Sequence, residues 1–190
     1  MRDVVVLVGS LRKASFNRKM AHALRDLASG ELALEEVEIG SLALYNEDLE
    51  AAVPDAWTRF RDRVRRAEAV LFVTPEYNRS VPGVLKNAID VGSRPYGKSV
   101  FSRKPAAVVS VTGGMLGAFG ANHHLRQSLV FLDMPALQQP EMYIGGAAKL
   151  FDDQGRIVSD DTRALLKKFV DAFARWIEIN SSTPQRHNAQ

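Results

Sequence analysis

Residues 4–17 read VVVLVGSLRKASFN, and this stretch decides the fold of the chain. The run from Val4 to Val8 is apolar and rich in β-branched side chains, which is typical of a strand buried on both faces of a sheet. Gly9 then marks a turn, and apolar residues recur at three- and four-residue spacing from Phe16, which predicts a helix. The stretch therefore predicts the first strand–turn–helix unit of a parallel sheet.

The turn in this unit carries hydrogen-bond donors that suit an anion. Ser10, Ser15 and Asn17 offer neutral donors, and Arg12 offers a charged one. The first helical turn adds N–H groups and the positive end of the helix dipole. We interpret the turn as a phosphate cradle, although a simple helix cap at Ser15 with Arg12 in solvent explains the same residues. Neither the Walker motif nor GxGxxG is present, so glycines alone would not hold the phosphate.

Composition predicts one globular domain over residues 1–180, followed by a polar, flexible tail over 181–190. The chain has 190 residues, of which 46% are hydrophobic and 25% charged, and a net charge of +3. This mild charge gives no reason to expect nucleic acid, and no apolar run is long enough to span a membrane. The absence of cysteine excludes disulfides and thiolate nucleophiles and suits a reducing compartment. No signal peptide is visible, so we expect a cytoplasmic protein.

Further strands and helices alternate along the chain. Strands are predicted over 32–39, 69–74, 105–111 and within 135–144, and helices from Pro54, over 84–91, after 118, and from a cap at Asp160 or Asp161. The last helix is expected to bury Leu165, Leu166, Phe169, Phe173, Trp176 and Ile177. This alternation predicts an α/β fold with a doubly wound, five-stranded parallel sheet and helices on both faces. Of the two common strand orders we expect 2-1-3-4-5.

Two charged or polar groups carry no predicted chemistry. The helix after Pro54 carries five arginines, which could form an anion-binding face. Because this helix has a clear apolar stripe on its other side, we favour a solvated outer surface for them. They are Arg59, Arg61, Arg63, Arg65 and Arg66. His123 and His124 could ligate a metal, but adjacent helical residues point about 100° apart. We therefore predict no metal-ligating residue. We also predict no catalytic side chain.

The loops after the first, third and fourth strands have unusual composition. In the order 2-1-3-4-5 these loops emerge side by side at the carboxyl edge of the sheet, where such sheets bind ligands. Gly113 and Gly114 would let a flat ring approach the backbone, and Tyr77 offers an aromatic surface. A phosphate at one end and a flat ring at the other describe a mononucleotide. A flavin fits better than a base alone, because nothing else resembles catalytic machinery.

Three segments in these loops resemble a known family. GSLRKASFN at 9–17, TPEYNRSVPGVLKNAID at 74–90 and TGG at 112–114 are similar to the NADPH-dependent FMN reductases, flavodoxin-like proteins, and most to the bacterial quinone and chromate reductases. The resemblance implies a homodimer or homotetramer that binds FMN. It also implies electron transfer from NADPH or NADH to a small-molecule acceptor such as a quinone, free flavin, chromate or an azo compound. Our hypothesis for this reaction is ping-pong hydride transfer.

The resemblance also implies the residues that bind the cofactor. They are Ser10, Arg12, Ser15, Phe16 and Asn17 around the phosphate, Pro75, Glu76, Tyr77, Asn78 and Arg79 around the ring and ribityl chain, and Thr112, Gly113 and Gly114 at the ring. Arg79 stands where relatives often have an aromatic residue, and Val91 where they often have tryptophan, which leaves the acceptor range open.

Several choices stay open at this point. An electron-carrier flavodoxin is an alternative, although such carriers are usually strongly acidic, and so is a non-enzymatic regulator that binds a phosphorylated ligand. Arg12, Arg79 and Arg103 are candidates for contact with the 2′-phosphate of NADPH. The helices around Val84 and Leu125 are candidates for an interface between subunits.

Overall fold

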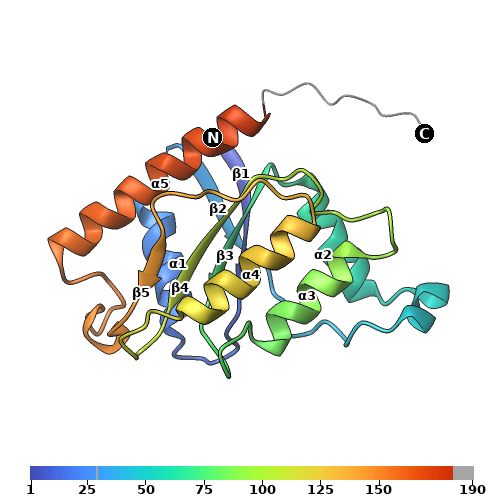
Figure 1. The fold of residues 1–190 in the computed structure, drawn as a ribbon, viewed down its shortest axis with the longest axis horizontal. Coiled ribbons are helices and arrows are strands. Elements are labelled where there is room, and N and C mark those ends of the chain that lie inside the picture. The colour runs from blue at the N-terminus through green and yellow to red at the C-terminus, as the bar shows by residue number, and fades with distance from the viewer. Residues whose placement is uncertain (29, 182–190) are drawn as a thin grey trace.

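The computed structural model describes residues 1–28 and 30–181. Its centre is a five-stranded, wholly parallel sheet in the order β2-β1-β3-β4-β5 (Figure 1). The strands are β1 (Arg2–Val8), β2 (Leu32–Glu36), β3 (Ala69–Thr74), β4 (Ala106–Val111) and β5 (Met142–Ile144). The predicted fold class and strand order are confirmed. The carboxyl ends of β1, β3 and β4 therefore lie next to one another, at the lower edge of the sheet in Figure 1.

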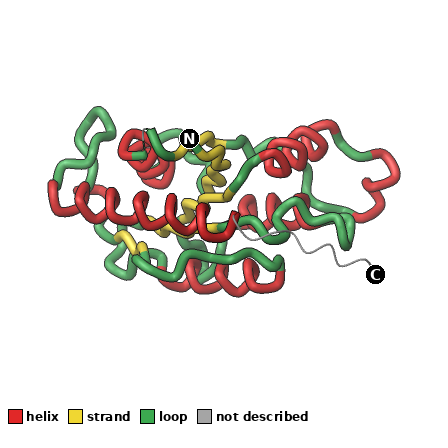
Figure 2. The backbone as a smooth tube through the Cα atoms, turned by 90° about the horizontal axis from the view of Figure 1, so that it is seen from above, coloured by secondary structure: helices red, strands yellow, loops and turns green. Residues whose placement is uncertain are grey.

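Helices cover both faces of the sheet. One face is covered by α1 (Phe16–Leu27) and α5 (Asp160–Ser181), and the other by α2 (Asp55–Arg66), α3 (Gly83–Ser93) and α4 (Phe119–Phe131). Two short 3₁₀ turns, η1 (Glu47–Ala52) and η2 (Ala147–Lys149), lie in the connections. Seen from above, the strands run through the middle of the molecule with helices on each side (Figure 2).

The two faces explain why β1 is apolar throughout. Val4, Val6 and Val8 pack into the core beneath α1 and α5, whereas Val5 and Leu7 pack into the core beneath the other helices. Successive side chains of a strand point to opposite faces, so a strand in the middle of a covered sheet needs apolar residues at every position. The central strand is thus specified by its own sequence.

Details at the ends of elements differ from the predictions. β2 ends at Glu36 and not at Ile39, and the side chain of Glu36 forms an ion pair with Arg18. Asp160 and Asp161 do not cap α5: the Ser159 hydroxyl accepts the backbone N–H of Thr162 at 3.3 Å. The predicted tail at 181–190 begins with the last residue of α5 and otherwise lies outside the described residues.

Of the residues predicted to be buried in α5, one is exposed and another is only partly buried. The helix buries its apolar stripe at Leu166, Phe169, Phe173 and Ile177, among others. Leu165 precedes this stripe by one position and is therefore 40% exposed. Trp176 is only partly buried, and its indole N–H donates to the carbonyl oxygen of Pro135 at 2.8 Å. No helix within the described residues has the length and hydropathy needed to cross a membrane.

The prediction of a solvated arginine face on α2 was wrong for two members of the run. Arg61 is buried, with its guanidinium bonded to both carboxylate oxygens of Glu50 and to the Val91 carbonyl. Arg63 pairs with Asp3 and Glu35. Because periodicity records only which helix face is apolar, it cannot show that an arginine reaches sideways to a carboxylate on another element.

Candidate functional site

A cavity of about 280 Å³ lies at the carboxyl edge of the sheet, between the loops that follow β1, β3 and β4. The three loops predicted to converge therefore do so. The cavity is lined by Ser10, Arg12, Ser15, Phe16, Asn17, Pro75, Glu76, Tyr77, Val111, Thr112 and Gly113. Three other predicted site residues do not line the cavity: Asn78 and Arg79 directly follow Tyr77, and Gly114 directly follows Gly113. Val111 was not predicted, because it reads as an ordinary buried strand residue.

The first loop brings Ser10 and Ser15 to the cavity. Both are almost fully buried, and Ser15 is the N-cap of α1. Its hydroxyl oxygen accepts the backbone N–H of Arg18 at 3.3 Å, which leaves its own hydrogen free to donate elsewhere. Capping and anion binding are thus compatible functions of one residue, since the same helix N-terminus faces the cavity.

Two arginines shape this loop. Arg12 is exposed, donates to the carbonyl oxygen of Ala14 at 2.9 Å, and lies over the ring of Phe16 at 5.6 Å. Arg18 donates to the carbonyl oxygen of Arg12 at 3.4 Å and to Glu36 at 2.8 Å. Arg18 therefore ties the loop to the end of β2. Sequence reasoning missed it, because nothing in the local pattern separates it from any other polar residue of a helix.

Asn17 has one satisfied and one free polar atom. Its side-chain N–H donates to the carbonyl oxygen of Val111 at 3.2 Å, across to the end of β4. Its side-chain oxygen is the one buried side-chain nitrogen or oxygen without a hydrogen-bond partner in the described part of the chain. Because buried polar atoms are rarely left unpaired, this oxygen marks a place where a ligand can donate a hydrogen.

The second loop forms a tight turn from Tyr77 to Ser80. The backbone N–H of each end residue donates to the carbonyl oxygen of the other, at 3.0 and 2.9 Å. The central residues Asn78 and Arg79 have φ values of 51° and 64°. This pattern is that of a type I′ turn, whose second central position favours glycine. The turn holds the half-exposed ring of Tyr77 beside the cavity.

The third loop leaves open space over its glycines. A Cβ placed on Gly113 or Gly114 would meet no heavy atom within 4 Å. The end of β5 and the residues that follow it hold this loop in place: Thr112 N–H donates to the Ile144 carbonyl at 2.9 Å, and Gly146 N–H donates to the Gly114 carbonyl at 3.2 Å. Packing within the chain therefore does not require glycine at 113 or 114, and the space beside them is free for a ligand.

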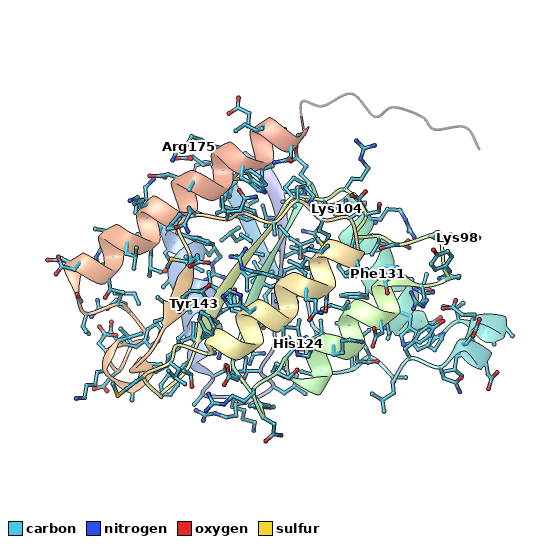
Figure 3. The ribbon with its side chains drawn as sticks, viewed as in Figure 1. Lys98, Lys104, His124, Phe131, Tyr143 and Arg175 are labelled. Atoms are coloured by element: carbon cyan, nitrogen blue, oxygen red, sulfur yellow. The ribbon has the colours of Figure 1, made fainter. Side chains whose placement is uncertain are left out.

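A pair of histidines lies on α4 near this edge. His123 Nε2 is 2.9 Å from the hydroxyl oxygen of Tyr143, and His124 Nδ1 is 2.7 Å from that of Ser80 (Figure 3 labels His124 and Tyr143). Burial raises the pKa of Tyr143 to about 12, and the nearby carboxylate of Glu141 acts in the same direction. The two histidines therefore contact different residues. Among the described residues no cluster of three or more His, Asp or Glu side chains is arranged to hold a metal.

Two further expectations are changed by the structure. Arg103 bonds through its backbone to Asp133 just before β4, at the amino edge of the sheet, so it lies at the wrong edge to share a ligand with Arg12 and Arg79. Leu125 itself is fully buried in the core beneath α4, so only the outer side chains of that helix are available to an interface between subunits, which stays a prediction.

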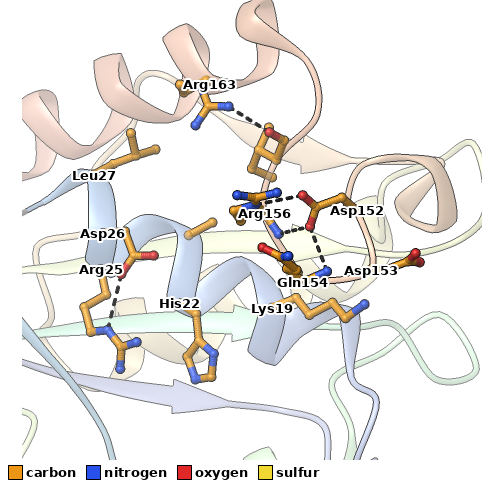
Figure 4. A pocket seen from close by; sticks show the side chains of 13 residues that line it. Lys19, His22, Arg25, Asp26, Leu27, Asp152, Asp153, Gln154, Arg156 and Arg163 are labelled. Carbon is orange, nitrogen blue, oxygen red and sulfur yellow. Dashed lines mark hydrogen bonds and ion pairs between the residues drawn. The ribbon is translucent and has the colours of Figure 1, made fainter.

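A larger open cavity of about 830 Å³ lies elsewhere, between α1 and the turn at 152–156 (Figure 4). Several of its charged groups are already bonded within the chain. Asp152 accepts three hydrogen bonds from the backbone and side chains of the turn, two of them from Arg156, which lower the pKa of its carboxyl group. Arg163 donates to the Ile157 carbonyl at 2.8 Å. Without a free buried polar atom, this cavity is a weaker candidate than the smaller one.

Comparison with known proteins agrees with this geometry. A model of the NADPH-dependent FMN reductases matches residues 2–149. A quinone reductase of Pseudomonas putida strain KT2440 is 66% identical over 94% of this chain and 96% of its own length. A 2-hydroxy-1,4-benzoquinone reductase of a Burkholderia species is 45% identical, over 92% of this chain and 95% of that protein. The solved structure of FerB, a flavoenzyme NAD(P)H:acceptor oxidoreductase from Paracoccus denitrificans, is 42% identical and superposes with a TM-score of 0.91, covering 95% of this chain and 99% of that one.

Proposed function

This chain belongs to the NADPH-dependent FMN reductase family of flavin-dependent oxidoreductases, and from that premise we propose that its 280 Å³ cavity binds FMN and serves to reduce quinones with NADPH or NADH. The observation that carries the proposal is the buried, unpaired side-chain oxygen of Asn17, a residue that lines a cavity otherwise rich in donors. FMN offers both kinds of partner, because its ribityl hydroxyls donate hydrogens and its phosphate accepts them.

The phosphate fits the loop from Ser10 to Arg12 and the start of α1. The hydroxyls of Ser10 and Ser15 can each donate a hydrogen, and Arg12 is exposed and able to turn its guanidinium toward an anion. Asn17 is a poor phosphate ligand in this arrangement, since its N–H is engaged with Val111 and its oxygen would face an oxygen. We therefore assign Asn17 to a ribityl hydroxyl.

The ring fits between the loops after β3 and β4. Tyr77 and Pro75 give apolar surface, and Gly113 and Gly114 give space for a flat ring against the backbone. FMN, when bound, supplies the hydride chemistry by which two electrons pass from a reduced nicotinamide to an acceptor. The residues of the chain bind and orient it, and the half-exposed ring of Tyr77 leaves an open approach that a nicotinamide and an acceptor can use in turn. We assign no acid or base.

The names of the relatives support a quinone as the acceptor, since two of them are quinone reductases. Free flavin, chromate and azo compounds are acceptors to test beside quinones. Arg12 and Arg79 lie at the same edge of the sheet as the cavity, so they are the residues to test for preference between NADPH and NADH. Because reduced nicotinamides are cytoplasmic substrates, we place the enzyme in the cytoplasm.

We also propose that the protein forms a homo-oligomer through the outer side of α4. Phe119, Val130 and Phe131 are 50%, 80% and 72% exposed, and large apolar side chains at this level of exposure suit a protein interface (Figure 3 labels Phe131). Sedimentation or light scattering of the purified protein tests this assembly, and the replacement of Phe131 by Ser should weaken it.

The function is tested by the visible spectrum of the purified protein. We expect the flavin absorption bands, with the flavin released on denaturation identified chromatographically as FMN. Anaerobic addition of NADPH or NADH should bleach the bands, and a quinone should restore them. Colour without bleaching would favour an electron carrier. A protein that stays colourless with added FMN would overturn the proposal and favour a regulator that binds another phosphorylated ligand.

A further inference from the structure

Helix α4 begins without a side-chain cap of its own. Its N-cap residue is Ala118, which has a left-handed backbone (φ 58°, ψ 38°) and no polar side chain. The missing acceptor comes from another part of the chain: Glu76 Oε2 accepts the backbone N–H of Ala121 at 3.0 Å. An acidic group at this position also meets the positive end of the helix dipole. The loop after β3 thus supplies the cap of a helix that begins more than forty residues later.

Gly120 provides the space for this contact. A Cβ at position 120 would lie 2.9 Å from Glu76 Oε2 and 3.0 Å from the carbonyl oxygen of Arg79. Any other residue at this position would therefore push the carboxylate or the Arg79 backbone away from the helix. The close approach of α4 to the loop depends on the absence of a side chain there.

The Tyr77–Ser80 turn is held to α4 at both of its ends. Glu76 precedes the turn and bonds to Ala121, and Ser80 ends it, with its hydroxyl oxygen 2.7 Å from His124 Nδ1. Glu76 is largely buried, whereas its second partner, Arg79, is 74% exposed and 3.3 Å away. Because exposed ion pairs contribute little, the bond to the helix is the stronger constraint on Glu76.

We infer that Glu76 is a positioning residue, whose carboxylate fixes the Tyr77–Ser80 turn to the N-terminus of α4 and so sets the place of Tyr77 against bound FMN. This inference rests on the proposed function. It differs from a direct role in binding: although Glu76 lines the cavity, the hydrogen bonds of its carboxylate go to the helix and to Arg79.

The test is FMN titration of the apoprotein, followed by quenching of flavin fluorescence, in three variants. We expect Glu76→Ala to raise the Kd for FMN at least tenfold. Glu76→Gln keeps an acceptor for the Ala121 N–H and should stay within threefold of the wild type. Asp62→Asn is the matched control, because Asp62 also pairs with an arginine three residues away but lies on α2, remote from the cavity, and it should change nothing.

A second variant perturbs the same contact from the other side. Gly120→Ala places a Cβ against the Glu76 carboxylate, which weakens the cap of α4, but it also raises the helix propensity; because these two effects oppose each other, the unfolding temperature of the apoprotein should change little. We nevertheless expect at least a fivefold rise in the Kd for FMN, together with faster amide hydrogen exchange over residues 76–80. A loss of affinity without a loss of stability separates positioning from general support of the fold, and it remains measurable should Glu76→Ala fold poorly.

The outcomes are distinct. If Glu76→Ala binds FMN as tightly as the wild type, Glu76 does not position the turn. If Glu76→Gln is as weak as Glu76→Ala, an acceptor for the Ala121 N–H is not what FMN binding requires of this residue, which also overturns the inference. If the wild-type apoprotein binds no FMN, the proposed function fails before the variants are compared.

Discussion

The side-chain amide of Asn17 donates a hydrogen bond to the carbonyl oxygen of Val111, joining the first turn of α1 to the last residue of β4 across 94 positions of sequence. This bond sets the orientation of the amide and leaves its oxygen buried as an unpaired acceptor, in a residue that lines the cavity. A ligand that pairs with this oxygen must therefore donate a hydrogen. Replacing the amide by a carboxylate tests this, because it exchanges the donating N–H for a second acceptor and hardly changes the shape of the side chain.

Asn17→Asp should lower the free energy of unfolding of the apoprotein by about 1–3 kcal/mol, because a carboxylate oxygen would face the Val111 carbonyl. It should also raise the Kd for FMN more than tenfold, since it places a negative charge near the phosphate. Asn87→Asp is the matched control: Asn87 is buried and donates to two carbonyl oxygens at 3.1 Å, but it does not line the cavity. Urea unfolding and FMN titration should show both variants destabilised and only Asn17→Asp impaired in binding; equal Kd values would contradict the assignment.

Gly113→Ala and Gly114→Ala should leave the apoprotein as stable as the wild type, or up to about 1 kcal/mol more stable, because a Cβ meets open space at both positions. Binding of FMN should nevertheless weaken, since the methyl group would occupy space needed by the ring. Gly117→Ala is the contrast: Gly117 has a φ of 60°, and its Cβ would lie 2.5 Å from the Tyr143 carbonyl carbon, so this variant should be clearly destabilised. Thermal unfolding with and without FMN distinguishes the two patterns.

Arg79→Gly should raise the free energy of unfolding by about 1 kcal/mol, because Arg79 holds a left-handed conformation that costs a side-chain residue roughly that amount. The lost ion pair with Glu76 is exposed on the arginine side and offsets only a few tenths. Arg79→Val, with a β-branched side chain in the same conformation, should be less stable than the wild type. Urea unfolding of the three proteins tests the order Gly, Arg, Val, and a reversed order would argue against strain at this turn.

Stability should fall as the pH rises between 10 and 12, because burial holds the pKa of Tyr143 at about 12. Below pH 10 the phenol is protonated in both folded and unfolded chains, and its stabilising contribution is complete. Above pH 10 the unfolded chain releases the proton and the folded one retains it, so the contribution is lost progressively, to at most about 2 kcal/mol given the partial exposure of the ring. Tyr143→Phe should show a shallower fall in urea unfolding over this range; parallel slopes would contradict the shifted pKa.

The sequence was sufficient for the architecture and for the convergence of the loops. The run Val4–Val8 could be recognised as a central strand because both of its faces must be apolar. In the expected strand order, which is one of two common for such sheets, the loops at Ser10–Asn17, Pro75–Tyr77 and Thr112–Gly113 had to meet at one edge. These conclusions depend on local pattern and topology, which a single sequence records.

The rest depends on contacts between distant side chains, which periodicity does not record. Arg61 reaches Glu50 from the polar side of α2, and Ser159 rather than the following aspartates satisfies α5. The role of Val111 in orienting Asn17 could not be predicted either, because it involves only a backbone carbonyl. For the same reason the bond between Glu76 and Ala121 has no signature in the sequence beyond a glycine at 120.

The link between Asn17 and Val111 has a consequence for how the protein matures. The walls of the cavity come from three segments that meet only when β4 has taken its place beside β3. A nascent chain still lacking β4 has the first two loops but not the carbonyl that orients Asn17. Uptake of the proposed FMN should therefore come late in biogenesis, after the sheet is assembled, and every molecule that carries flavin would be one in which this assembly is complete.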